Sequence, residues 1–176
     1  PILFIGDSGT AKTVTINHYL SYNINQRLYN TVTMNFSSRT SSLDAQLIIE
    51  HHTDKRTGTI YGPPPGHKLV LFIDDLNMPK VDKYGTQQCI ALLKFLLQYK
   101  VMYDRTGDEN KGERLQKKTY HDLLYIAAMA PPGGGRNNID SRFISLFNIF
   151  SMNFPSEDEL EYIYNSILSN HFDNFN

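Results

Sequence analysis

The sequence predicts an α/β fold in which a five-stranded, mainly parallel sheet lies between helices. Two apolar runs, at residues 2–5 and 68–73, have the composition of strands buried on both faces. A glycine-containing loop and an amphipathic segment at 14–20 follow the first run directly, which predicts a strand, a turn and a helix. Strand-like and helix-like segments then alternate to the end of the chain, as in parallel sheets with crossover helices.

The loop after the first strand has the composition of a phosphate-binding loop. Its glycines would let backbone N–H groups face phosphate oxygens, Lys12 would reach the β- and γ-phosphates, and the Thr13 hydroxyl would ligate Mg²⁺. Ala11 stands where a glycine is usual, and its methyl group is tolerated if that residue is already helical. A turn without a ligand is the alternative interpretation. The candidates for nucleotide contact are Gly6, Asp7, Ser8, Gly9, Thr10, Ala11, Lys12, Thr13 and Val14.

The second apolar run ends in two carboxylates, Asp74 and Asp75. In open α/β sheets ligands bind at the carboxyl ends of the strands, so both side chains are expected at the binding edge. Asp74 would hold Mg²⁺ directly or through water. Asp75 would orient or deprotonate an attacking water. Taken alone, both could equally be solvated turn residues before Asn77.

The other elements follow in order. Residues 30–36 alternate and are rich in β-branched side chains, which predicts a strand. Capping-box signatures begin one helix at Ser41 and the final helix at Ser156. The first apolar strand and the one before Asp74 are expected in central positions. The remaining expectations are a helix end near His51, a hairpin over 55–61, a helix over 85–99, a strand over 122–130, a short helix and last strand within 143–152, and a final helix through Leu168.

Composition limits the class of protein. The 176 residues are 40% hydrophobic and 20% charged, which indicates a globular domain rather than a disordered chain. A formal net charge of −1 without a long basic run gives no support for nucleic acid as a main partner. No apolar run is long enough to span a bilayer, so no membrane is expected as a partner. The single cysteine, Cys89, is expected to be a core residue in a reducing compartment. The abrupt start on a strand at Pro1 suggests a piece of a larger protein.

Three polar segments allow a functional and a structural interpretation. His51 and His52 are adjacent, so on a helix they point about 100° apart and are expected to be helix-end groups rather than metal ligands. The loop 131–136 is glycine-rich but lacks a following Lys-Thr pair, and a flexible connector is preferred to a second phosphate cradle. The segment 103–121 is expected to be an exposed hairpin or loop. Its cations are interpreted as a solvated face rather than a phosphate or filament contact: Lys111, Arg114, Lys117 and Lys118.

Long motifs of this chain resemble those of dynein heavy chains. They are the phosphate loop with Ala-Lys-Thr, residues 35–44 (NFSSRTSSLD), residues 72–88 (FIDDLNMPKVDKYGTQQ), residues 127–137 (AAMAPPGGGRN) and residues 140–143 (DSRF). The resemblance runs nearly end to end and is strongest to the third AAA+ module of the axonemal type. It implies an AAA+ P-loop NTPase fold, an αβα sandwich with a five-stranded parallel sheet. Residues 1–176 would be one large subdomain of a much larger motor protein, without the small helical subdomain.

The resemblance also implies a ligand and partners. The ligand would be ATP or ADP with Mg²⁺, bound between neighbouring modules of a ring. The third module resembles a gate whose nucleotide state tunes the motor. Partners would be the neighbouring modules and linker of the same heavy chain, the microtubule through the full-length motor, and dynein intermediate and light chains. The location would be the cytoskeleton, in the axoneme of a cilium or flagellum, and the cytoplasm. Segments 53–61 and 103–121 match insertions that face the linker or neighbouring parts.

Site roles transfer from the family to matching positions. Lys12, Thr13 and Asp74 match its phosphate and metal positions. Asp75 stands where an active ATPase usually has Glu, and Ala130 stands where a polar sensor, commonly Asn, is usual. Arg142 matches the arginine finger that reaches the neighbouring module, although a local salt bridge is the alternative. Arg136 is the second candidate for the finger.

These assignments leave competing functions. Asp75 and Ala130 favour a regulatory nucleotide-binding module with slow or no hydrolysis. A catalytically active ATPase module that contributes to motility is the main alternative. An unrelated P-loop kinase or GTPase is a third, although the chain has neither an Asn-Lys-x-Asp segment for reading guanine nor an arginine-rich lid.

Overall fold

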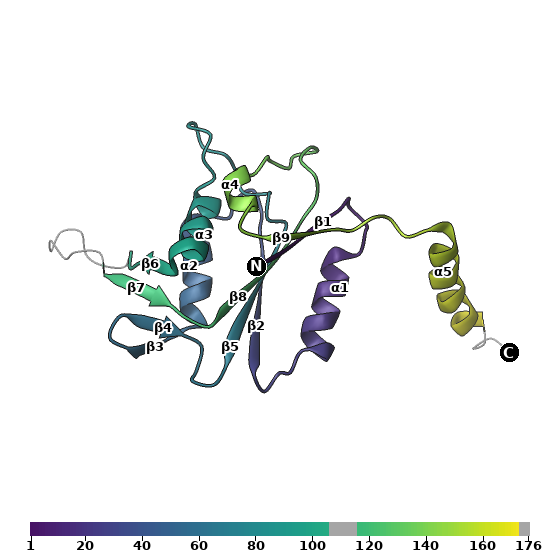
Figure 1. Cartoon of the computed structure of the whole chain (residues 1–176). Coiled ribbons are helices and arrows are strands. Elements are labelled where there is room, and N and C mark those ends of the chain that lie inside the picture. The colour runs from purple at the N-terminus through teal and green to yellow at the C-terminus, as the bar shows by residue number, and fades with distance from the viewer. Residues whose placement is uncertain (106–115, 173–176) are drawn as a thin grey trace.

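The computed structural model describes residues 1–105 and 116–172, and its centre is a five-stranded parallel sheet (Figure 1). The strand order is β2-β5-β8-β1-β9, and every neighbouring pair is parallel. The predicted sheet is therefore confirmed. Both apolar strands are interior as expected, but β8 takes the middle position. The strands are β1 (Ile2–Ile5), β2 (Tyr29–Asn35), β5 (Lys68–Asp74), β8 (Leu123–Met129) and β9 (Asn148–Ser151).

Helices cover both faces of this sheet (Figure 1). On one face lies α1 (Lys12–His18), which continues into a π-helical turn, η1 (Tyr19–Asn23). On the other face lie α2 (Ser42–His51) and α3 (Gln88–Tyr99). The result is the three-layered αβα sandwich that the sequence predicts.

The strand β5 shows why its sequence is continuously apolar. Leu69, Leu71 and Ile73 point into the core under α2 and α3, whereas Val70 and Phe72 pack beneath α1. All five side chains are at most 2% exposed. Because successive residues of a strand face opposite sides, a strand covered on both faces has no position left for a polar side chain.

The helix boundaries follow local polar contacts. Ser41 and Asp44 form the predicted capping box, with Ser41 N donating to Asp44 Oδ2 at 2.9 Å and Asp44 N to Ser41 Oγ at 3.2 Å. The helix α3 begins at Gln88, three residues later than predicted, because the Asp82 carboxylate accepts bonds from the backbone of Tyr84 and Thr86 and closes a turn there.

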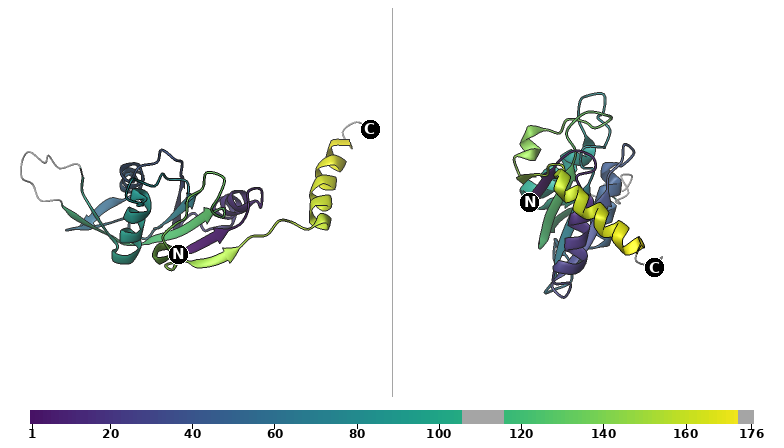
Figure 2. Two further views of the ribbon diagram at one scale, coloured as in Figure 1. Left: turned by 90° about the horizontal axis from the view of Figure 1, so that it is seen from above. Right: turned by 90° about the vertical axis from the view of Figure 1, so that its right-hand side faces the viewer.

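Near the carboxyl end are two further helices. The short helix α4 (Ser141–Ile144) precedes β9, and a second capping box at Ser156 begins α5 (Glu157–Phe172), which extends four residues beyond the predicted end. Helix α5 stands away from the sheet at the end of an extended segment (Figures 1 and 2). No helix of the described residues combines the length and the apolar character needed to cross a bilayer.

A second, four-stranded sheet lies beside α2 and α3, in the order β3-β4-β7-β6 (Figure 1). The predicted hairpin is confirmed as β3 (Asp54–Thr57) with β4 (Ile60–Gly62). The second expected insertion, 103–121, contains β7 (Lys117–Tyr120). This strand pairs antiparallel with β6 (Val101–Tyr103), which leads into the insertion. Since β4 pairs with β7, the two insertions form one sheet.

Lys118 corrects the prediction of a solvated face. Its side chain is buried, and its Nζ lies 3.2 Å from Glu50 Oε1 on α2 and 3.0 Å from Asp104 Oδ2. Lys117 is exposed as expected, whereas Lys111 and Arg114 fall outside the described residues. The sequence interpretation failed because β-strand alternation turns Lys118 inward and Lys117 outward.

Two other side chains are placed as predicted. Cys89, in the first turn of α3, is 1% exposed and faces the core, and burial raises the pKa of its thiol to about 12. A thiol with this pKa remains protonated near neutral pH and is a poor nucleophile. His52 closes the end of α2, with its Nδ1 2.8 Å from Ile48 O, so it is a helix-end group.

Candidate functional site

The candidate site lies at the carboxyl ends of β1, β5 and β8. These three strands are neighbours, with β8 in the middle, so the loops that follow them meet at one edge. Gly6 N donates to Met129 O at 3.3 Å and Leu76 N donates to Ala128 O at 3.1 Å, which ties both neighbouring loops to the end of β8. The edge is where open α/β sheets bind ligands.

Lys12 is held inside the curl of the phosphate loop. Its Nζ donates to Gly6 O at 2.8 Å, to Asp7 O at 2.6 Å and to Thr10 Oγ1 at 3.1 Å. Burial lowers the pKa of this ammonium, and the nearby Asp74 carboxylate opposes that effect. A buried cation satisfied by neutral oxygens is well prepared to accept an anion such as phosphate.

Glycine is required at the start of this loop. A Cβ added to Gly6 would lie 2.3 Å from Met152 O and 2.9 Å from Thr10 Oγ1. Gly9 has φ +90°, a conformation that L residues with side chains rarely adopt. Because the loop passes this close to the backbone of Met152, just after β9, there is no room for a side chain at Gly6.

Ala11 departs from the prediction. The sequence predicts that the Ala11 methyl group is tolerated if this residue is already helical. In the structure Ala11 has φ 57° and ψ 20°, in the left-handed region, and α1 begins only at Lys12. A glycine at this position would adopt that conformation without the steric cost of a Cβ. The variant loop therefore keeps the shape of a glycine loop and carries backbone strain.

Thr13 and Asp74 meet as predicted, although they are 61 residues apart in the chain. Thr13 Oγ1 donates to Asp74 Oδ2 at 2.7 Å, and Asp74 Oδ1 accepts from Asp75 N at 3.0 Å. The pair presents a hydroxyl and a carboxylate oxygen side by side. Mg²⁺ prefers oxygen ligands of this kind and usually binds through one or two carboxylates with substrate phosphates, so these residues fit the ion.

Asp75 and Ala130 are the two unusual positions of the site. Asp75 is exposed, with φ 50°, and projects from the end of β5 next to Asp74. Ala130 is 5% exposed and offers only its backbone, whose oxygen accepts from Asn77 Nδ2 at 2.8 Å. Neither side chain supplies the longer carboxylate or the polar sensor of an active family site.

The two candidate arginines lie in different places. Arg142 is exposed on α4, and its backbone N–H donates to Asp140 Oδ1. The pKa of the Asp140 carboxyl is lowered first by the bond from Lys94 and then by this backbone bond, with a smaller contribution from the Arg142 charge. No contact joins its side chain to the phosphate loop within the described residues. Arg136 follows the end of β8, and its charge is close enough to Lys12 to lower the pKa of the lysine. Val14 is 70% exposed on α1.

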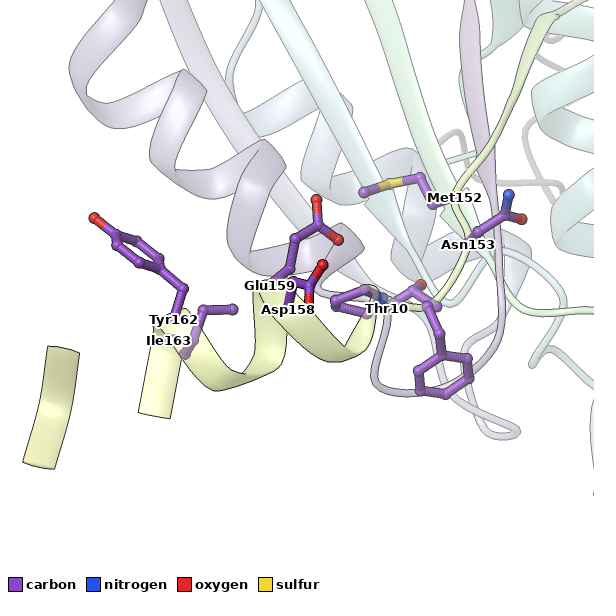
Figure 3. A pocket seen from close by; sticks show the side chains of 9 residues that line it. Thr10, Met152, Asn153, Asp158, Glu159, Tyr162 and Ile163 are labelled. Atoms are coloured by element: carbon purple, nitrogen blue, oxygen red, sulfur yellow. The ribbon is translucent and has the colours of Figure 1, made fainter. Parts of the chain in front are cut away.

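A cleft of about 720 Å³ adjoins the tip of the phosphate loop (Figure 3). It lies between Thr10, the segment after β9 and the first turns of α5, and both Tyr162 and Ile163 of that helix line it. The volume is within the range of small-molecule sites. Sequence reasoning missed this part because its residues lie about 150 positions from the loop and carry only a helix-capping motif, which gives no indication of a ligand. The other lining residues are Met152, Asn153, Phe154, Pro155, Asp158 and Glu159.

Comparisons with known proteins agree with this geometry. Residues 1–155 match the family model described as "P-loop containing dynein motor region". The chain is 53% identical over 171 residues to "Dynein-1-alpha heavy chain, flagellar inner arm I1 complex" of Chlamydomonas reinhardtii, which covers 97% of this chain and 4% of that protein. It is 50% identical over 175 residues to "Dynein axonemal heavy chain 10" of Homo sapiens, 99% of this chain and 4% of that one. The chain thus spans about 4% of the length of these relatives, and it belongs to the P-loop dynein motor region of axonemal dynein heavy chains.

Proposed function

We propose that this chain is a nucleotide-binding AAA+ module of an axonemal dynein motor and binds ATP or ADP with Mg²⁺. The observation that carries the proposal is the bond between Thr13 Oγ1 and Asp74 Oδ2 at 2.7 Å, beside the buried Lys12. It brings the expected metal ligands together next to the expected phosphate ligand. Bound Mg²⁺ would supply positive charge that neutralises the phosphate oxygens.

The cleft between the loop and α5 supports a nucleotide rather than a bare phosphate. Met152, Phe154, Tyr162 and Ile163 give it apolar and aromatic walls, and it opens at Thr10, next to the phosphate loop. A purine base needs an apolar slot of this kind, and its triphosphate needs the cationic loop beside it. We assign the base and sugar to the cleft and the phosphates to residues 6–13.

The preferred role is regulatory, as the third module of the ring, with slow or no hydrolysis. Asp75 is one methylene shorter than the usual Glu, and a displacement of about 1 Å at a catalytic group can cost roughly a hundredfold in rate. Ala130 cannot donate a hydrogen bond through its side chain to a phosphate or a water. A hydrolytic module that contributes to motility is the second candidate, because Asp75 still presents a carboxylate at the site. In either role Arg142, exposed on α4, would serve the neighbouring module.

The proposed partners follow from the same family. They are the neighbouring modules and linker of one heavy chain, the microtubule through the complete motor, and dynein intermediate and light chains. The proposed location is the cytoskeleton, in the axoneme of a cilium or flagellum, and the cytoplasm. The relatives named above as flagellar and axonemal support it. The four-stranded sheet is the surface that we assign to the linker or neighbouring parts.

Calorimetric titration of Mg-ADP and of a non-hydrolysable Mg-ATP analogue into the wild type and Lys12→Ala tests this function. We expect saturable binding by the wild type and loss of at least about tenfold in affinity in Lys12→Ala, because the variant lacks the charge-assisted bonds to phosphate. The matched control is Lys117→Ala, which removes an exposed lysine far from the site and should leave affinity unchanged. Equal binding by Lys12→Ala and the wild type would refute the proposed site.

A further inference from the structure

Arg136 lies on a loop that the sheet topology carries to the centre of the site. The loop leaves the carboxyl end of β8, the strand between β5 and β1. It therefore starts between Asp74, at the end of β5, and Gly6, after β1. A cation from this loop needs no neighbouring subunit to reach the phosphates.

The loop is held in place at its base, so it is not the free connector that the sequence suggested. Asn77, 1% exposed, donates from Nδ2 to Ala130 O, and its own carbonyl accepts from Asn137 N at 3.0 Å. Asn77, in the loop that follows β5, thus bonds to the residues on both sides of the segment 131–136. Gly133 and Arg136 also exchange two backbone bonds of 3.1 and 3.0 Å, which close the turn.

The Arg136 side chain has a cationic group but lacks a matching anion. Its Nε is buried without a hydrogen-bond partner, and no carboxylate pairs with it in the part of the chain that the structure describes. Lys12, whose Nζ donates only to neutral oxygens among the described residues, is a second cation at this edge of the sheet. An anion bound at this edge would attract both cations.

We propose that Arg136 binds the γ-phosphate of an ATP held by its own chain's phosphate loop, a group that ADP lacks. The inference rests on the proposed function and adds a ligand to it. Arg136 would supply, from six residues further along, the polar contact that Ala130 at the end of β8 lacks. An arginine has a planar fork of donors that matches phosphate oxygens. Because only a nucleoside triphosphate offers the γ-phosphate, this contact favours ATP over ADP.

This assignment separates the two arginines. Arg142 is exposed on α4 and is left to act on the neighbouring module, whereas Arg136 acts within its own chain. Arg136 is then a binding residue that distinguishes ATP from ADP. Arg27, exposed just before β2 at the opposite edge of the sheet, is the matched control for the loss of one arginine.

The test compares Mg-ADP and a non-hydrolysable Mg-ATP analogue in the 176-residue chain by calorimetry. The proteins are the wild type, Arg136→Ala, Arg136→Lys and Arg27→Ala, with thermal melts to establish that each is folded. We expect Arg136→Ala to weaken the ATP analogue by about tenfold to a hundredfold and ADP by less than about twofold, the effect of one charge-assisted contact. Arg136→Lys should recover part of the loss, and Arg27→Ala should match the wild type.

The outcomes separate the two proposals. Arg136→Ala that weakens both nucleotides equally, or neither, overturns the role of Arg136 and leaves the nucleotide site intact. Equal losses in Arg136→Ala and Arg27→Ala would also overturn it, because net charge alone would explain them. A wild type that binds neither nucleotide overturns the proposed function together with this inference.

Discussion

At the scale of single residues, the proposed nucleotide site combines the expected contacts with two unusual side chains. Ala11 takes the left-handed conformation of a glycine, and Asp75 follows β5 with a carboxylate that is one methylene shorter than that of Glu. The contacts of Lys12 and Thr13 are nonetheless in place. The binding function and the hydrolytic function therefore depend on different residues and can be tested separately.

Ala11→Gly is expected to stabilise the protein. A left-handed conformation costs an L residue about 1–2 kcal/mol, and glycine removes this cost. Glycine also makes the unfolded chain more flexible, which destabilises the folded state by about 0.4–1 kcal/mol. We expect a net gain of about 0.5–1 kcal/mol in the free energy of unfolding, measured in urea. The control is Ala91→Gly, exposed within α3, which should lose about 1 kcal/mol. Similar losses in both variants would show that Ala11 is unstrained.

Asp75→Glu is expected to raise ATP turnover by at least about tenfold, because the longer side chain carries the carboxylate nearer to the attacking water. Affinity for ADP should remain within about twofold, since the change does not touch the phosphate ligands. Steady-state phosphate release measures the first and calorimetry the second. Asp75→Asn is the control and should show no gain. Unchanged turnover in Asp75→Glu would mean that the missing sensor at Ala130, rather than side-chain length, limits hydrolysis.

At the scale of elements, one buried lysine joins the second sheet to α2. Lys118 on β7 contacts Glu50 on α2 and Asp104 after β6, and Gln46 on α2 donates to Tyr103 O at 2.8 Å. The two insertions are thereby attached to the helix that follows β2. A motion of the four-stranded sheet would therefore be transmitted to α2.

Lys118→Met is expected to lower the free energy of unfolding by about 3 kcal/mol, because it removes a buried cation that contacts two partly buried carboxylates. Burial alone would lower the pKa of Lys118, but the bonds to Asp104 and Glu50 outweigh it and raise the pKa. The stabilisation is thus complete below the unfolded pKa of about 10.4 and is lost as pH rises through the higher folded value.

Urea titrations of both proteins from pH 7 to pH 11 measure this effect. The difference between wild type and Lys118→Met should be constant to about pH 10 and shrink above it. Lys117→Met, on the exposed side of the same strand, should differ little from the wild type at any of these pH values. A difference that persists unchanged at pH 11 would show that packing, and not charge, accounts for the loss.

At the scale of the whole molecule, the candidate site is shared between the αβα sandwich and α5. The sandwich supplies the phosphate loop and the metal ligands, while α5 and the segment before it supply the walls of the cleft (Figure 3). In the structure α5 stands apart from the sheet, with Tyr162 75% and Ile167 61% exposed. A ligand that fills the cleft would therefore bridge two parts of the molecule that otherwise touch little.

Nucleotide binding is expected to slow amide hydrogen exchange in two separate segments, 6–13 and 152–163, because ADP contacts both sides of the cleft. Exchange measured with and without saturating Mg-ADP tests this. Lys12→Ala with the same ADP is the control and should show protection in neither segment. Protection confined to 6–13 would show that the base lies outside the cleft and that α5 takes no part in binding.

Local sequence patterns were sufficient for the strands, for the capping boxes at Ser41 and Ser156, and for singling out Lys12, Thr13 and Asp74 as candidate ligands. These features depend on side-chain alternation, on bonds across three residues or on one short loop, so neighbouring residues contain the information. The middle position of β8, the strain at Ala11, the burial of Lys118, the cleft beside α5 and the placement of Arg136 arise from contacts between distant segments. No local pattern records such contacts, because their energies depend on which strands become neighbours, and that is settled only when the whole sheet assembles.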